Sequence, residues 1–172
     1  YKIYRSRGGN GNASTSVDLT SYNVTLPSNS LELALCRYSE IMLHPVIDQE
    51  TIDVQREAVK EEKRQRDNQP YSRFYQYLKE NLFESHPYTY PLIGFIEDLD
   101  NSSLEDFLNF KEKFYAPSNA VFVIAGDIDI DETKKLVAEY FNEIPNKGDK
   151  PIKDYPSEEL FKEMRVKEYD PN

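Results

Sequence analysis

Three glutamates in one strongly charged stretch are the residues of this sequence best suited to chemistry. Glu57, Glu61 and Glu62 fall in a predicted helix that Asp48 caps and that runs through residues 49–66. Carboxylates can bind metal ions, but Glu57 and Glu61 are four residues apart and repel each other unless neighbouring Arg and Lys side chains relieve them. By spacing alone, the cluster is most simply a solvated helix face.

The two histidines do not complete a metal site. A catalytic zinc ion usually takes three protein ligands and a water. His44 and His86 each precede a proline, and neither belongs to a His-x-x-Glu-His or His-Glu-x-x-His arrangement. We therefore expect both to make ordinary hydrogen bonds or face solvent. The sequence also lacks a Gly-x-Ser-x-Gly elbow, and the glycines of residues 8–11 are not followed by the lysine of a phosphate loop.

Composition limits the classes of partner. The net charge of −10 repels nucleic acid and anionic lipid, so neither is expected as a partner. No apolar run is long enough for a membrane span. With 38% hydrophobic and 13% aromatic residues, the 172-residue chain can bury a sizeable core. The single cysteine, Cys36, is expected as a small core residue of a helix.

The elements that must position these residues are helices separated by a few strands. A strand is predicted over residues 12–26, with a bulge or bend near Thr20 where its apolar phase slips. Its first half is polar on both faces, which suits a sheet edge. The apolar run 120–125 predicts a central strand, and residues 164–169 form a further candidate. Helices are expected from 29 to 44, from 48 to 66, after Pro70, after a Ser103 cap, and after an Asp131 cap.

This order predicts an α+β fold, a largely antiparallel sheet with helices packed on one face. We expect residues 1–172 to form a single partial domain. Residues 1–70 would hold the edge strand and the charged helix. Residues 71–172 would hold the following helices, the central strand and the start of a next segment.

Four blocks of the sequence, in order, resemble one family. Residues 54–66, followed by Asn-Gln-Pro-Tyr at 68–71, resemble the helix that carries the third zinc ligand in bacterial insulinase-type peptidases of the pitrilysin class, the inverted zincins. Residues 12–16 resemble the family's active-site edge strand. The blocks 86–99 and 115–127 resemble its following loop, cap and strand.

The resemblance implies a zinc metallopeptidase and assigns the glutamates roles that spacing could not. In this family a His-x-x-Glu-His helix supplies two ligands and the general base, and a second helix supplies the third ligand. The matching position here is Glu62, with Glu61 as the adjacent alternative. The family often has a supporting acid seven residues earlier, where this sequence has the neutral Gln55.

The resemblance also implies how a substrate would bind. An extended peptide would add as a strand along the edge and pair with main-chain groups. A zinc-activated water would then attack its peptide carbonyl. Family members often work as two related halves, so a second half or subunit is an expected partner. The residues expected to bind substrate are Asn12, Ala13, Ser14 and Thr15.

The first metal-binding helix should lie about seventy to eighty residues before Glu62, which places it before Tyr1. We therefore expect the general base outside this sequence, zinc only in the complete enzyme, and no activity from this chain alone. The alternative is a non-catalytic half or subunit of the same fold that acts as a binding or scaffolding partner. A bacterial periplasm or cell envelope is the expected location.

Overall fold

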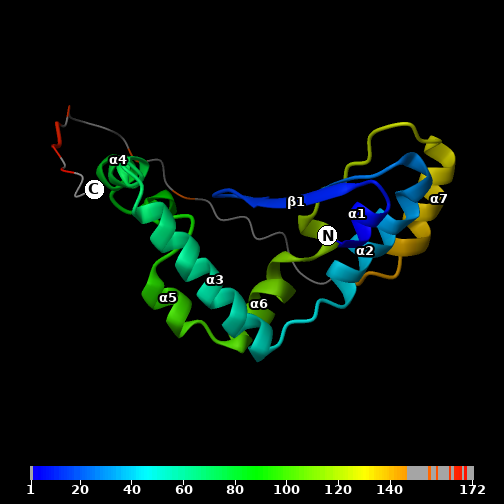
Figure 1. Ribbon diagram of the computed structural model, residues 1–172, viewed down its shortest axis with the longest axis horizontal. Coiled ribbons are helices and arrows are strands. Elements are labelled where there is room, and N and C mark those ends of the chain that lie inside the picture. Colours follow the sequence, from blue (N-terminus) through cyan, green and yellow to red (C-terminus); the bar gives the residue numbers. More distant parts are fainter. Residues whose placement is uncertain are drawn as a thin grey trace. The chain divides into compact units, whose positions relative to one another are not determined.

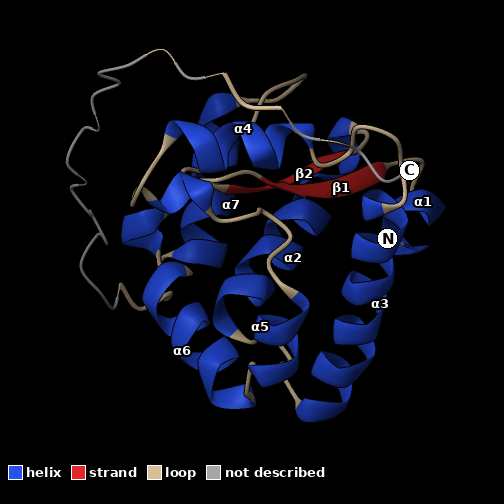
Figure 2. Ribbon diagram, turned by 90° about the vertical axis from the view of Figure 1, so that its left-hand side faces the viewer, coloured by secondary structure: helices blue, strands red, loops and turns tan. Residues whose placement is uncertain are grey.

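The computed structural model describes residues 2–146, 155, 158, 163, 165–167 and 169. The described residues form seven α-helices, three short 3-10 helices and one two-stranded antiparallel sheet, which confirms the α+β class (Figures 1 and 2). The strands are β1 (Asn10–Thr15) and β2 (Thr20–Thr25). The helices are α1 (Lys2–Ser6), α2 (Leu31–Leu43), α3 (Gln49–Asp67), α4 (Phe74–Leu82), α5 (Ile96–Asn101), α6 (Leu104–Phe114) and α7 (Ile130–Phe141).

The chain divides into two compact units. Unit 1 holds residues 1–47 and 105–151, and unit 2 holds residues 48–104 and 152–172. The edge strand therefore belongs to unit 1, and the charged helix α3 belongs to unit 2. This division cuts across the expected boundary at residue 70, and the expected single partial domain stays a prediction.

Residues 10–25 fold as a hairpin rather than as one strand with a bulge. Asn10 pairs with Thr25 and Thr15 with Thr20, and the main-chain N–H of Ser16 donates to the carbonyl oxygen of Leu19 at 2.8 Å across the turn. The apolar phase slips near Thr20 because the chain turns there from β1 to β2. One face of the hairpin is wholly polar, because Asn and Ser residues of β1 pair there with Ser, Asn and Thr residues of β2.

Unit 1 has a small core centred on α2. Leu35 is fully buried, and the Tyr140 hydroxyl of α7 donates to Glu32 of α2 at 2.8 Å. That hydrogen bond and burial raise the pKa of Tyr140 to about 12. Phe122 packs against rings of both helices, with centroid distances of 6.2 Å to Tyr38 and 5.1 Å to Phe141. These contacts hold α2 and α7 together.

In unit 2, α3 begins where the sequence predicts. The Asp48 side chain accepts a hydrogen bond from the Thr51 N–H at 2.8 Å, and this bond lowers the pKa of Asp48. Ile52 and Lys60 are the buried residues of α3. The Lys60 ammonium pairs with Asp100 of α5, so a buried cation ties the two helices together.

Several sequence expectations prove wrong. Residues 120–125 form no strand, since no strand among the described residues pairs with them, and Val121 and Val123 are 93% and 76% exposed. Their hydrophobicity predicted a central strand, but Phe122 is also 44% exposed and only Ile124 is half-buried. Helix α7 begins at Ile130 with Asp129 as its cap, two residues before the expected Asp131. Cys36 is exposed, one position round α2 from the buried Leu35.

Two short helices, α1 and α5, were not predicted, because five or six residues carry too little periodicity to identify a helix. The candidate strand at 164–169 includes residues outside the described part, so it stays a prediction. Among the described residues, no helix has the length and apolar character needed to cross a membrane.

Candidate functional site

One side of β1 is unpaired, as expected for an edge strand. Its only strand partner among the described residues is β2. Ser16 bonds to Leu19, and hydrogen-bonded pairs alternate along an antiparallel ladder. Asn10, Asn12 and Ser14 therefore direct their main-chain groups toward β2. The N–H and C=O groups of the residues between them, Gly11, Ala13 and Thr15, point to the open side.

Nearby acceptors confirm this direction for two of the outward N–H groups. The Gly11 N–H donates to the Asn10 Oδ1 atom at 3.0 Å, and the Ala13 N–H donates to the Asn12 Oδ1 atom at 2.9 Å. Thr15 lies at the next outward position, and no described group accepts its N–H. The open edge thus consists of the outward main-chain groups of Gly11, Ala13 and Thr15. The last two lie in the exposed segment Asn12–Thr15, and Gly11 directly precedes it.

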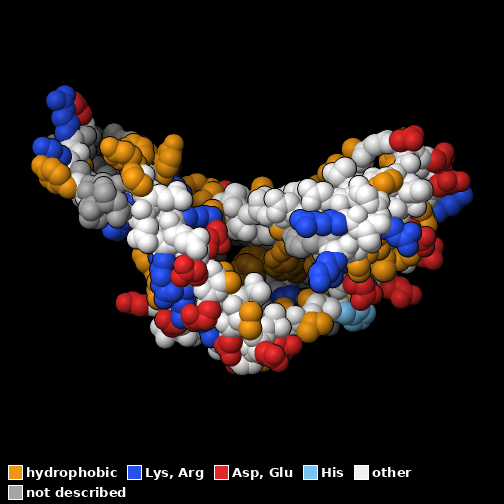
Figure 3. All heavy atoms as spheres, viewed as in Figure 1, with side chains coloured by type: hydrophobic (Ala, Val, Ile, Leu, Met, Phe, Trp, Pro, Cys, Tyr) orange, Lys and Arg blue, Asp and Glu red, His pale blue; other side chains and the backbone are white. Residues whose placement is uncertain are grey.

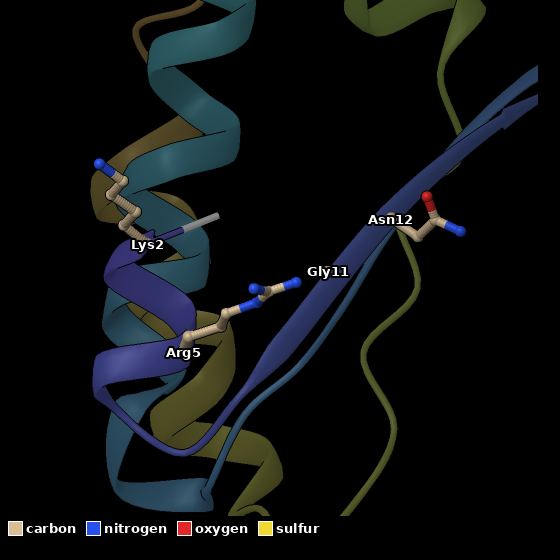
Figure 4. A pocket seen from close by; sticks show the side chains of 4 residues that line it. All are labelled: Lys2, Arg5, Gly11 and Asn12. Carbon is tan, nitrogen blue, oxygen red and sulfur yellow. The ribbon is translucent and has the colours of Figure 1, made fainter.

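Helix α1 packs on one face of the start of β1. A side chain at Gly11 would come within 3.1 Å of the Tyr4 ring, so glycine lets the buried Tyr4 approach the strand. Lys2, Arg5, Gly11 and Asn12 line a hollow of about 360 Å³ here. Figure 4 shows the Arg5 side chain reaching toward β1 at Gly11, while the Asn12 side chain leaves the strand on the opposite side.

The predicted zinc ligand Glu62 lies on the exposed side of α3. Its side chain is 54% exposed, and its Oε1 atom accepts a hydrogen bond from the Arg66 Nη2 atom at 2.7 Å. The carboxylate therefore forms an ion pair with a cation of its own helix. Acidic and basic side chains are interspersed over α3 in Figure 3. The pairing at four-residue spacing is the ordinary one for a helix surface.

The alternative ligand and the support position lie on the same helix. Glu61 is exposed, accepts from Gln65 at 3.2 Å and lies 3.5 Å from Arg64. Gln55 is exposed and lies seven residues before Glu62, which places it two turns away on nearly the same side of α3. The structure therefore puts Gln55 and Glu62 in line, whereas Glu61 points elsewhere.

The described residues alone do not form a zinc site. No group of three or more His, Cys, Asp or Glu residues among them could hold a metal ion. His44 bonds Glu40 of its own helix at 3.2 Å, and the His86 ring accepts from the Tyr88 N–H at 3.2 Å, as the ordinary interpretation of both predicted. Catalytic zinc needs three protein ligands, of which Glu62 would be one.

The charge network beneath α3 was not found from the sequence. Lys60 is 8% exposed and also pairs with Glu57 at 2.9 Å, and its hydrogen bonds to Asp100 and Glu57 raise its pKa. The Arg56 guanidinium donates to the Ser102 carbonyl oxygen at 2.6 Å. Neither Asp100 of α5 nor Ser102, which follows that helix, could be foreseen as a partner, because α5 itself was not predicted. The network holds the side of α3 that carries Lys60 and Arg56, and Glu61 and Glu62 stay on the exposed side of the helix.

Two family models match consecutive parts of the chain. Residues 2–95 match the insulinase family, peptidase family M16, and residues 101–172 match the peptidase M16 inactive domain. The first match covers β1 and the whole of α3. It therefore includes both parts of the predicted site.

Individual relatives agree with the family models. The chain is 32% identical to the zinc protease PqqE of Helicobacter pylori over 88% of its own length and 34% of the relative's. It is 27% identical to the uncharacterized zinc protease YmfH of Bacillus subtilis, over 98% of its own length and 37% of the relative's. The chain thus spans about one third of these curated relatives.

Solved structures show the same fold. A crystal structure of a protease from Helicobacter pylori superposes with a TM-score of 0.83 at 31% identity, covering 89% of this chain and 37% of that one. The first half of the periplasmic protease PqqL from Escherichia coli gives a TM-score of 0.76 at 22% identity, covering 86% of this chain and 32% of that one. This chain belongs to the insulinase family of peptidases, family M16.

Proposed function

We propose that this chain supplies the substrate-binding edge strand and one zinc ligand, Glu62, of a zinc metalloendopeptidase that hydrolyses extended peptides. The open edge of β1 is the observation that carries this proposal. Its outward main-chain groups at Gly11, Ala13 and Thr15 give an added peptide strand donors and acceptors at alternate residues. The peptide carbonyls would displace the Asn10 and Asn12 side chains, which accept from the Gly11 and Ala13 N–H groups in the free chain. Such pairing uses hydrogen bonds to the peptide main chain, so peptides of many sequences can bind.

Glu62 supports the metal part of the proposal through its place on α3. It is the position that matches the family's third ligand, and its carboxylate is accessible rather than buried. In the complete enzyme, zinc would supply an activated water and polarise the peptide carbonyl. The other ligands and the general base would come from a part of the parent protein outside this sequence. A second related half or subunit would complete the enzyme.

A cleavage assay of the full-length protein that contains this chain tests the proposal. The protein should cleave an unstructured peptide, lose activity with a zinc chelator and regain it when zinc is restored. Glu62→Gln should abolish cleavage while the circular dichroism spectrum stays unchanged. Cleavage that resists both the chelator and Glu62→Gln would contradict the proposal.

A non-catalytic half or subunit of the same fold is the second candidate, and Gln55 is the observation that favours it. A neutral amide stands where the family often has a supporting acid. In that case the full-length protein would bind peptide along β1 without cleaving it, even with zinc present. Peptide binding and cleavage, measured on the same sample, separate the two functions.

We also propose that the parent protein works in the bacterial periplasm or cell envelope. The fold shared with the periplasmic protease PqqL supports this location. Fractionation of the source cells, with detection of the full-length protein in each fraction, tests it. Recovery with the cytoplasmic fraction alone would contradict it.

A further inference from the structure

We infer that Arg5 makes the edge strand selective for an acidic residue in the peptide, at the position that pairs opposite Gly11. This inference rests on the proposed docking of a peptide strand along β1. It adds a side-chain preference to a mode of binding that otherwise reads only the backbone.

The pairing with Gly11 decides the face on which the peptide side chain would lie. Residues directly opposite each other in a sheet project their side chains to the same face. Gly11 faces α1, because a side chain built there would meet the Tyr4 ring at 3.1 Å. A peptide residue paired opposite Gly11 would therefore project its side chain toward the face that α1 covers.

That face has space for a side chain beside Gly11. Gly11 has no side chain, so nothing from β1 itself fills the hollow of about 360 Å³ beside it. Paired residues have Cβ atoms about 4.5–5.5 Å apart, which puts the incoming side chain at the mouth of this hollow. The start of β1 thus offers room for one peptide side chain.

A positively charged side chain borders that space. Arg5 is exposed and reaches toward β1 at Gly11, and Lys2 lies three residues earlier on the same short helix (Figure 4). Neither cation forms an ion pair with an acidic side chain of the described residues. Figure 4 shows the Lys2 side chain extending away from β1, so Arg5 is the cation that faces the strand at Gly11. Arginine pairs with carboxylates through two parallel hydrogen bonds, and an Asp or Glu side chain is the matching ligand.

Binding of a peptide series to the full-length protein tests the inference. A single Glu is moved along an otherwise neutral fluorescent peptide, and matched peptides carry Gln or Lys at each position. At one position Glu should bind about three-fold more tightly than Gln, and Lys more weakly than Gln. The preference should disappear in about 1 M salt, where the screening length is about 3 Å.

Variants assign the preference to Arg5. Arg5→Gln should remove it, Arg5→Lys should keep part of it, and Lys2→Gln should reduce it less than Arg5→Gln does. Arg37→Gln is the matched control, because Arg37 is an exposed cation of unit 1 that does not line the hollow. Equal affinities for the Glu, Gln and Lys peptides at every position, or a preference that survives Arg5→Gln, would overturn the inference.

The same series separates this inference from the docking on which it rests. Thr15→Pro removes an outward N–H and should weaken all peptides to a similar degree. If Thr15→Pro weakens binding but no position prefers Glu, strand docking stands and selectivity by Arg5 is wrong. If the wild-type protein binds none of the peptides, both are wrong.

Discussion

At the scale of residues, the choice of Glu62 as the zinc ligand rests on the family resemblance. Spacing alone could not choose between Glu61 and Glu62, and the resemblance fixed the frame. The structure adds that Glu62 pairs with Arg66 and lies in line with Gln55 on α3. Exposed ion pairs contribute little to stability, so Arg66 would not hold the carboxylate firmly against a metal ion. The pair follows the four-residue spacing of Glu62 and Arg66, which the sequence already shows.

Thr15 offers a direct test of strand docking at the same scale. Proline at this position removes the outward N–H, which bonds to no described group, and leaves the ladder to β2 intact. We expect Thr15→Pro to raise the KM of the full-length enzyme about two- to ten-fold, the loss of one hydrogen bond. Thr15→Ala keeps the N–H and should leave KM unchanged. An unchanged KM in Thr15→Pro would exclude pairing at this residue.

At the scale of elements, long periodic segments could be predicted and short ones could not. Helices α2, α3 and α4 lie where apolar spacing predicts them, and of the three only α3 has a side-chain N-cap hydrogen bond. The hairpin was missed because its four-residue turn, residues 16–19, carries two apolar side chains and so looked like strand. The run 120–125 was misassigned because hydrophobicity does not reveal whether a partner strand exists.

The cap of α3 makes stability depend on pH in the acid range. The hydrogen bond from Thr51 lowers the pKa of Asp48 below its ordinary value of 3.8 in the folded state. Its stabilisation is therefore complete above pH 3.8 and is lost as the pH falls through the folded-state pKa. Asp48→Ala should lower Tm at pH 7, and the difference from wild type should shrink below pH 3.8. Asp48→Asn keeps a neutral cap and should reduce the pH dependence, and parallel Tm curves for all three proteins would contradict this account.

Helix α2 should carry much of the stability of unit 1. Leu35 is fully buried, so Leu35→Ala removes apolar surface and leaves a cavity. We expect it to lower the free energy of unfolding by about 2–5 kcal/mol, measured by urea denaturation followed by circular dichroism. Leu19→Ala is the control, because Leu19 is 59% exposed and should change this energy by about 0.5 kcal/mol or less. Equal effects of the two changes would show that α2 does not form the core.

At the scale of the whole molecule, the chain exposes unusually many large apolar side chains. Val46, Tyr71, Val121 and Val123 are each more than 75% exposed, at 80%, 78%, 93% and 76%. We expect the 172-residue chain alone to bind a hydrophobic dye and to self-associate in sedimentation experiments. Val121→Ser combined with Val123→Ser should reduce both effects, whereas Val54→Ser on the charged helix α3 should not. A monomer that binds no dye would contradict this expectation.

The central claim is that Glu62 holds zinc in an enzyme assembled from this chain and other parts of its parent protein. Zinc content of the purified full-length protein, measured by elemental analysis after dialysis, tests it most directly. The account predicts one tightly bound zinc ion in the wild type and in Glu61→Gln, and at least a ten-fold loss of zinc affinity in Glu62→Gln. Full zinc content in Glu62→Gln, or its loss in Glu61→Gln alone, would contradict the account.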